Sequence, residues 1–259
     1  MQAATPAADA PRTIDQIIAA LNAILDQSLR EGERIGYFAA LYERVTTNVR
    51  RALVAGNVFQ DNARMERLDV VFANRFLHAW DQHRAGTQPS RSWHVAFGAL
   101  DDPTPLVVQH LLLGMNAHIN LDLGIAAATV APDPAALEAL WPDFKRINEV
   151  LARLVRVVED ELAEISPRLA RIEEIAPLLE DRIFDFGIDV ARDFAWALAR
   201  ELARTPTDQW PHVISQRDAT VAEAGGALYP LHGLAGFAEK WIREKESNDV
   251  RYNIQVVAG

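Results

Sequence analysis

The sequence contains no cysteine among its 259 residues, and this absence removes several kinds of chemistry. Without thiols the chain cannot form disulfides, bind a metal through thiolates or use a cysteine nucleophile. Basic residues are also few: 26 Lys and Arg face 36 Asp and Glu, which gives a formal net charge of −10. Because general nucleic-acid binders are usually basic, we expect no nucleic-acid partner. The absence of cysteine fits a cytoplasmic protein, and we expect that location.

Familiar catalytic signatures are missing as well. The sequence has no G-x-S-x-G elbow, phosphate-binding loop, dinucleotide fingerprint or H-E-x-x-H zinc motif. Its first residues, MQAATPAADAPR, lack the basic start and the apolar stretch of a signal peptide. Their Ala- and Pro-rich composition predicts a disordered tail over residues 1–12.

Helix signals run almost without interruption through the rest of the chain. Thr13 and Gln16 have the spacing of a capping box in front of an amphipathic segment. Strand patterns do not alternate with helical ones, which argues against an α/β sheet. We therefore predict an all-α protein, with one helical, bundle-like domain over residues 13–249 around a buried central helix at about 105–130. The β-branched stretch VRYNIQVVAG predicts an extended C-terminal tail over residues 250–259.

The segment from Pro105 to Ala131 is the most unusual part of the chain. It is apolar on every side of a helical wheel, which is typical of a central, buried helix. Its length also suits a bilayer, but it has polar residues near its middle and no charged or aromatic anchors, so we expect no membrane span. The polar side chains of this segment are Gln109, His110, Asn116, His118, Asn120 and Asp122.

These polar side chains form two stripes when residues are placed about 100° apart. His110, Gly114, His118 and Asp122 follow one i+4 ridge, and the amides lie on the other side. Imidazole and carboxylate ligands suit a divalent metal such as zinc, iron or manganese, and a metal with an open position can activate water. The predicted metal ligands are His110, His118, Asp122 and Glu66.

Glu66 enters this set because a second predicted helix, from about Asn62 to His83, also directs carboxylates inward. Asp69 falls in the middle of its apolar face and Glu66 at the edge. A carboxylate aimed at a core is almost never unpaired. Its partner is either a metal shared with the histidines or an arginine, and both alternatives stay open. The candidate arginines are Arg34, Arg75 and Arg192.

Acid–base chemistry without a metal is a further alternative. A histidine held by Asp122 or Asp69 in a dry pocket can act as a general base, and Tyr42 lies on a helix expected to pack nearby. The candidate catalytic residues are His110, His118 and Asp69.

Two interpretations of function therefore remain. The first is a metal-dependent enzyme with hydrolase-like water activation at the central helix, acting on a small-molecule ligand. The second is a non-catalytic helical domain that binds a small molecule or serves as a scaffold, with its buried polar residues in a structural network. The sequence pattern does not fix the oligomeric state.

Three blocks of the sequence resemble a known family. They are GYFAALYERVT (36–46), RMERLDVVFANRFL (64–77) and QHLLLGMNAHINLDLGIAA (109–127). They are similar to the bacterial family known only as domain of unknown function 5995, and the likeness extends over nearly the whole chain. The resemblance implies one helical domain and brings no activity, substrate or catalytic residue with it.

Overall fold

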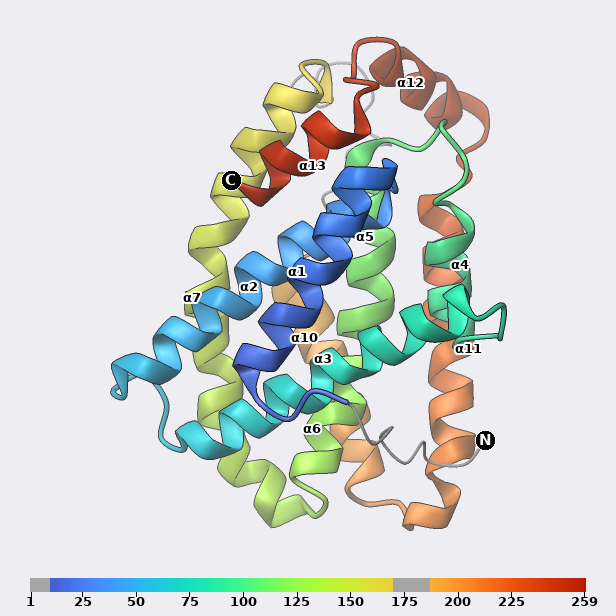
Figure 1. Cartoon of the computed structure of the whole chain (residues 1–259). Helices are drawn as coiled ribbons and strands as arrows, with labels where there is room; N and C mark the ends of the chain where they lie inside the picture. Colours follow the sequence, from blue (N-terminus) through green and yellow to red (C-terminus); the bar gives the residue numbers. More distant parts are fainter. Residues whose placement is uncertain (1–9, 170–186) are drawn as a thin grey trace.

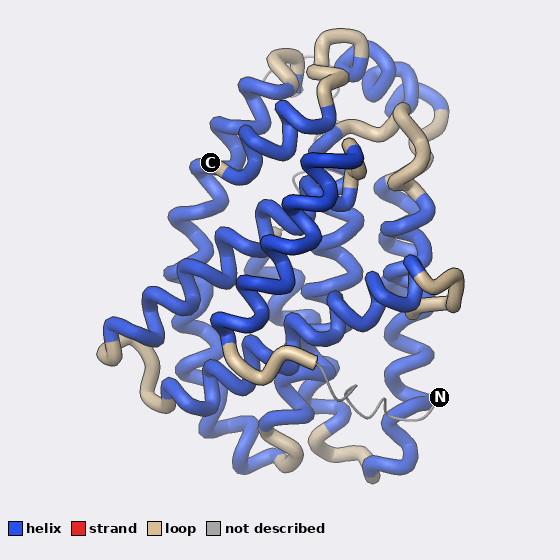
Figure 2. Tube along the Cα trace, in the orientation of Figure 1, coloured by secondary structure: helices blue, strands red, loops and turns tan. Residues whose placement is uncertain are grey.

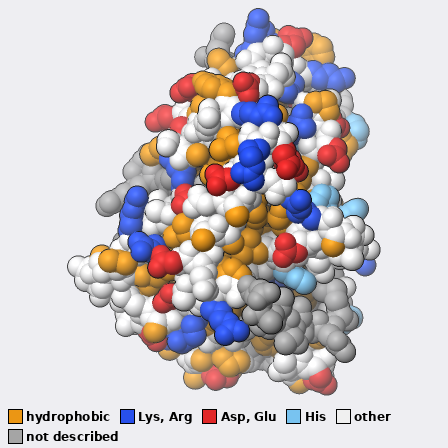
Figure 3. Space-filling model, in the orientation of Figure 1, with side chains coloured by type: hydrophobic (Ala, Val, Ile, Leu, Met, Phe, Trp, Pro, Cys, Tyr) orange, Lys and Arg blue, Asp and Glu red, His pale blue; other side chains and the backbone are white. Residues whose placement is uncertain are grey.

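The computed structural model describes residues 10–169 and 187–259, and its regular secondary structure in these ranges is entirely helical, without strands (Figures 1 and 2). This confirms the all-α prediction. Residues 1–9 of the predicted tail lie outside the described ranges. On the face shown in Figure 3, acidic and basic side chains are interspersed and do not gather in one patch.

The helices of the described ranges have the following bounds. In chain order they are α1 (Ile14–Glu31), α2 (Ile35–Ala55), α3 (Asn62–Arg84), α4 (Arg91–Gly98), α5 (Val107–Ala117), the π-helix η1 (His118–Leu123), α6 (Gly124–Val130), α7 (Pro134–Ile165), α10 (Ile188–Leu202), the 3-10 turn η3 (Thr207–Gln209), α11 (Trp210–Leu228), α12 (Gly233–Arg243) and α13 (Val250–Ala258).

The predicted central helix is present as α5, η1 and α6, which continue one another through the middle of the molecule (Figure 1). By length and composition alone Val107–Val130 could cross a membrane, but 83% of its most apolar 18-residue window is buried inside the fold. Because a core helix has the same composition, a single helix of this kind is weak evidence for a membrane span.

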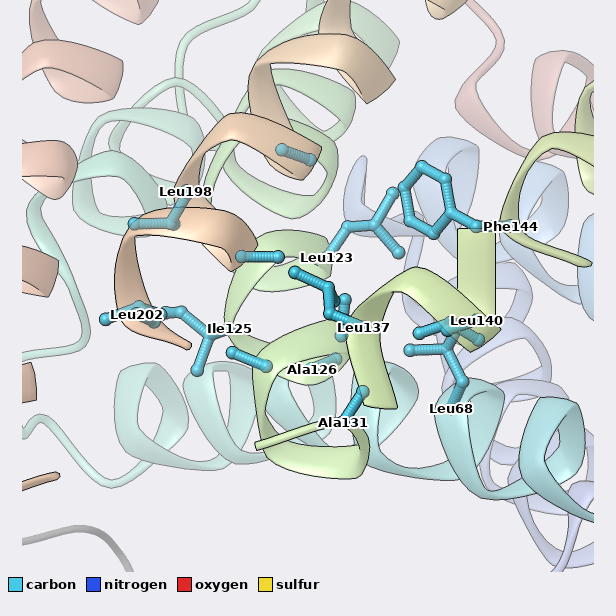
Figure 4. Close-up of a cluster of buried hydrophobic side chains, with 14 of the residues drawn as sticks. Leu68, Leu123, Ile125, Ala126, Ala131, Leu137, Leu140, Phe144, Leu198 and Leu202 are labelled. Atoms are coloured by element: carbon cyan, nitrogen blue, oxygen red, sulfur yellow. The ribbon is translucent and has the colours of Figure 1, made fainter. Parts of the chain in front are cut away.

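Small residues let a neighbouring helix approach the C-terminal part of the central helix closely. A Cβ atom placed on Gly124 would lie only 2.6 Å from the backbone oxygen of Ala195 on α10. Around this contact, side chains from α3, α6, α7 and α10 form a continuous apolar cluster (Figure 4). Close backbone approach and apolar burial together hold α6 in the core.

The amide stripe of the central helix anchors α11. Asn116 Nδ2 donates to the backbone oxygen of Val221 at 2.9 Å, and Asn120 Nδ2 donates to Asn116 Oδ1 at 2.9 Å. Gln109 Nε2 donates to the backbone oxygen of Leu228, also at 2.9 Å. These amides therefore satisfy one another and the neighbouring backbone, and their role is structural.

The C-terminal residues differ from the prediction. The extended tail expected over residues 250–259 is wrong, because Val250–Ala258 form helix α13, capped by Asp249, which accepts from the Tyr252 N–H at 3.1 Å. Ile254 and Val257 of this helix are fully buried. Burial of this apolar face against the body of the protein outweighs the modest helix propensity of its β-branched residues.

Candidate functional site

The central helix changes from α to π winding at His118–Leu123. Segments of π-helix are rare and occur frequently at functional sites. Within this segment His118 and Asp122, four residues apart, lie side by side, with His118 Nδ1 3.3 Å from Asp122 Oδ2. Both side chains are almost completely buried, at 3% and 2% exposure. The first feature of the candidate site is thus a buried histidine–carboxylate pair.

Asp122 is fixed from two further helices. Arg75 Nε of α3 donates to Asp122 Oδ1 at 2.6 Å, and Trp93 Nε1 of α4 donates to Asp122 Oδ2 at 2.8 Å. Burial by itself raises the pKa of Asp122, but Arg75 and the hydrogen bonds from His118 and Trp93 hold that pKa below its ordinary value. Asp122 is therefore an anion whose position is set by α3 and α4.

Aromatic rings enclose the imidazole of His118. The Phe72 ring stacks on it with centroids 3.6 Å apart, and the Tyr42 ring meets it nearly edge-on at 4.5 Å. Phe38 and Trp93 complete the enclosure at 5.8 and 5.9 Å. Burial lowers the pKa of His118, Asp122 opposes this effect, and Arg75 adds to it. The imidazole is consequently neutral near pH 7.

The neutral imidazole has a defined tautomer. Because Nδ1 faces the Asp122 carboxylate, the ring proton resides on Nδ1 and Nε2 carries a lone pair. Nε2 is buried and has no hydrogen-bond partner among the described residues. His118 therefore offers an unoccupied basic nitrogen inside the protein.

Two more polar groups of this region are buried. Within residues 10–169 and 187–259, neither the Tyr42 hydroxyl nor Asp69 Oδ2 has a hydrogen-bond partner. Burial and the Asp69 and Asp122 carboxylates raise the pKa of Tyr42 well above its ordinary value, so its phenol keeps its proton. Burial, with a smaller effect of Glu66, raises the pKa of Asp69 to about 7. The site thus also contains a phenol that stays protonated. It contains in addition a carboxyl group, that of Asp69, which can gain or lose a proton near neutrality.

His110 lies on the same i+4 ridge of the central helix as His118, but it does not lie among the side chains that surround His118. The ring of Phe38 packs on Gly114, between the two histidines along the ridge, so that a Cβ on Gly114 would lie 2.5 Å from Phe38 Cδ2. His110 instead contacts the ring of Tyr37 at 5.7 Å. The two imidazoles therefore occupy separate surroundings.

The predicted metal-ligand set does not come together for this reason. It consisted of His110, His118, Asp122 and Glu66. No group of three His, Asp or Glu side chains in the described part of the chain is arranged to hold a metal ion. Both oxygens of Asp122 are engaged by Arg75, Trp93 and His118. Glu66 is half-buried and accepts from the Ile14 N–H at 3.4 Å, at the start of α1.

Sequence reasoning missed two contributors to the site. Arg75 was considered as a partner of Asp69, whereas it pairs with Asp122. Trp93 was not among the candidate site residues. A local signal was available: Ser90 caps α4 by accepting from the Trp93 N–H at 3.4 Å, and a serine in this position predicts a helix start.

Comparison with known proteins adds a family but no activity. A family model described as "Family of unknown function (DUF5995)" matches residues 14–230. No curated protein and no solved structure matches the chain. The matched span contains the whole central helix and every side chain of the site from Phe38 to Asp122, and it ends before α12 and α13.

Proposed function

We propose that the chain, which belongs to the family of unknown function DUF5995, is an enzyme whose His118 acts as a general base on a small molecule. One observation carries this proposal: Nδ1 of His118 faces Asp122, while Nε2 is buried without a partner among the described residues. A base whose tautomer is set by a neighbouring carboxylate is the arrangement found at many hydrolytic and proton-transfer sites.

The energetics support a functional role for these groups. A buried polar atom without a hydrogen bond costs about 1–3 kcal/mol. Such atoms accumulate here on His118, Tyr42 and Asp69, in the part of the fold that the structure describes. Sequences depart from local stability rules mainly where function requires it.

The chemistry follows from the protonation states. His118 Nε2 accepts a proton from the substrate or from a water molecule, and the imidazolium that forms is stabilised by Asp122 and by the surrounding aromatic faces. Asp122 does not take this proton itself, because Arg75 holds its pKa low. The Tyr42 hydroxyl can donate to negative charge that develops on the substrate. Asp69, with a pKa of about 7, can return a proton.

The experiment compares the wild-type protein with His118→Gln on small esters, lactones and carbonyl compounds. Ester and lactone hydrolysis and deuterium uptake at the carbon next to the carbonyl are followed by NMR. We expect activity in the wild type and a loss of roughly 100-fold or more in His118→Gln, the usual range for a general base. His78→Gln, at an exposed histidine of α3, should retain full activity.

A structural role is the second candidate, because the Asp122 contacts join the central helix to α3 and α4. If His118→Gln keeps the wild-type rate, the general-base proposal is wrong. It is also wrong if the wild type is inactive throughout and His118→Gln loses as much thermal stability as Asp122→Asn. The buried polar groups are then a scaffold network.

A further inference from the structure

One of the aromatic walls around His118 reaches the surface of the protein. In the described part of the chain five aromatic side chains surround the imidazole. Four of them are exposed by 5% or less: Phe38, Tyr42, Phe76 and Trp93. The fifth is Phe72 of α3, which is only half-buried. Within this set of rings, Phe72 is therefore the side chain that stands between His118 and solvent.

The Phe72 ring covers one whole face of the imidazole. The two rings are parallel to within 8°, and their centroids are 3.6 Å apart. The other four rings meet the imidazole at interplanar angles between 52° and 90°. Aromatic pairs prefer offset or edge-to-face arrangements to full overlap, so attraction between the rings does not by itself explain this geometry. The overlap leaves no room for another molecule on that face of His118.

Helix α3 covers the His118–Asp122 pair with neighbouring side chains. Phe72 and Arg75 are three residues apart and are therefore neighbours on the helix surface. Arg75 Nε donates to Asp122 at 2.6 Å, and the Arg75 side chain is 31% exposed. Phe72 also approaches Tyr42, with ring centroids 6.0 Å apart. The same side of α3 thus contacts both members of the pair and the phenol, and it continues to the protein surface.

We propose that Phe72 closes His118 off from solvent and so limits the size of the molecules that reach its Nε2. The inference deepens the proposed function, and its second part, the limit on size, rests on that function. A smaller residue at position 72 should open a gap over the imidazole, because the surroundings of a large-to-small substitution relax only in part. The four buried rings on the other sides should keep their places.

The first test measures solvent access at His118 without any substrate. Deuterium exchange at the imidazole C2 position is followed by mass spectrometry over a pH series, which separates the maximal rate from the pKa. We expect the maximal rate at His118 to rise at least about fivefold in Phe72→Ala, and less in Phe72→Val, because access limits exchange at buried groups. His110 should exchange at its wild-type rate in both variants. Leu77→Ala, at another half-buried apolar residue of α3, should leave His118 unchanged.

The second test concerns the size of the substrate. Values of kcat/KM for hydrolysis of methyl acetate and of phenyl acetate are measured for the wild type, Phe72→Val and Leu77→Ala. We expect Phe72→Val to raise the ratio of phenyl to methyl acetate about tenfold, within the usual range for a change in the size of an apolar site. Leu77→Ala should keep the wild-type ratio.

The outcomes separate this inference from the proposed function. Unchanged exchange at His118 in folded Phe72→Ala or Phe72→Val, or an equal rise in Leu77→Ala, overturns the inference. An unchanged ester ratio in active Phe72→Val overturns the limit on size. If exchange rises as expected but Phe72→Val hydrolyses esters equally fast with and without His118→Gln, Phe72 does close the site and the His118 mechanism is wrong. Where neither ester is hydrolysed, the exchange rates alone decide whether Phe72 closes the site.

Discussion

At the scale of single residues, two buried aspartates show how differently one side chain can behave in the same core. Asp122 has an arginine, an indole and an imidazole around it, and its pKa is lowered despite burial. Asp69 has no comparable cation, and burial raises its pKa to about 7. Titratable groups whose environments separate their pKa values in this way are typical of acid–base sites.

The raised pKa of Asp69 makes a prediction about pH. Between about pH 4 and pH 7 the folded protein retains a proton that the unfolded chain has released, so stability falls as pH rises through this window. Each unit of pKa difference corresponds to about 1.4 kcal/mol. In Asp69→Asn we therefore expect a smaller fall, measured as the urea midpoint at each pH. A residual fall should remain, because burial also raises the pKa of Glu246 to about 7.

The matched control is Asp81→Asn, at an exposed position on the same helix. It should show the wild-type dependence on pH. If the urea midpoints of Asp69→Asn fall as steeply as those of the wild type, the carboxyl group of Asp69 is not protonated by burial as described.

At the scale of helices, glycines decide where backbones can approach. Gly124 admits α10 against α6, and Gly114 admits the Phe38 ring against α5. The central helix thus carries its polar ridge and its close contacts on the same short span. The two close contacts flank the His118–Asp122 pair, because Gly114 precedes His118 by four residues and Gly124 follows Asp122 by two.

Gly124→Ala tests this packing. Its added methyl group meets the backbone oxygen of Ala195, which cannot move without displacing α10, so we expect a loss of about 1–3 kcal/mol in unfolding free energy. Gly226→Ala on α11 is the control, because a Cβ there meets nothing within 4 Å among the described residues. It should stabilise the protein by up to about 1 kcal/mol through helix propensity. Chemical denaturation compares the two, and the same sign for both variants contradicts the packing argument.

At the scale of the whole molecule, the region beyond the matched family span supports the centre of the fold. Glu246 accepts from the Val107 N–H at 3.2 Å and so caps the start of α5. In α13, Ile254 packs on Gly36 of α2, where a Cβ would lie 2.5 Å from Ile254 Cδ1. Helices that follow the matched span are thus part of the same core.

Shortening the chain tests this dependence. A chain that stops after Asp249 should unfold at a lower temperature than Ile254→Ala, which itself should lose about 2–5 kcal/mol as a large-to-small core substitution. Gln255→Ala, at an exposed position of α13, should stay within about 0.5 kcal/mol of the wild type. A shortened chain as stable as the full one contradicts the role assigned to α13.

The sequence by itself determined the helical class, the buried central helix and the ridge from His110 to Asp122. These features depend on periodicity and on residues three or four positions apart, which are local properties of a helix. The capping contact of Thr13, which accepts from the Gln16 N–H at 3.3 Å, is local in the same sense.

Only the tertiary structure decided which of these groups meet. That Arg75 pairs with Asp122 depends on how α3 lies against η1, and no spacing in the sequence records this arrangement. In the same way, Phe38 arrives from α2 to occupy the space at Gly114 and separates the histidines that the ridge aligned. The helix formed by residues 250–258 depends on apolar surfaces far away in the chain. Local patterns set what each helix presents, whereas packing between distant segments selects the partners.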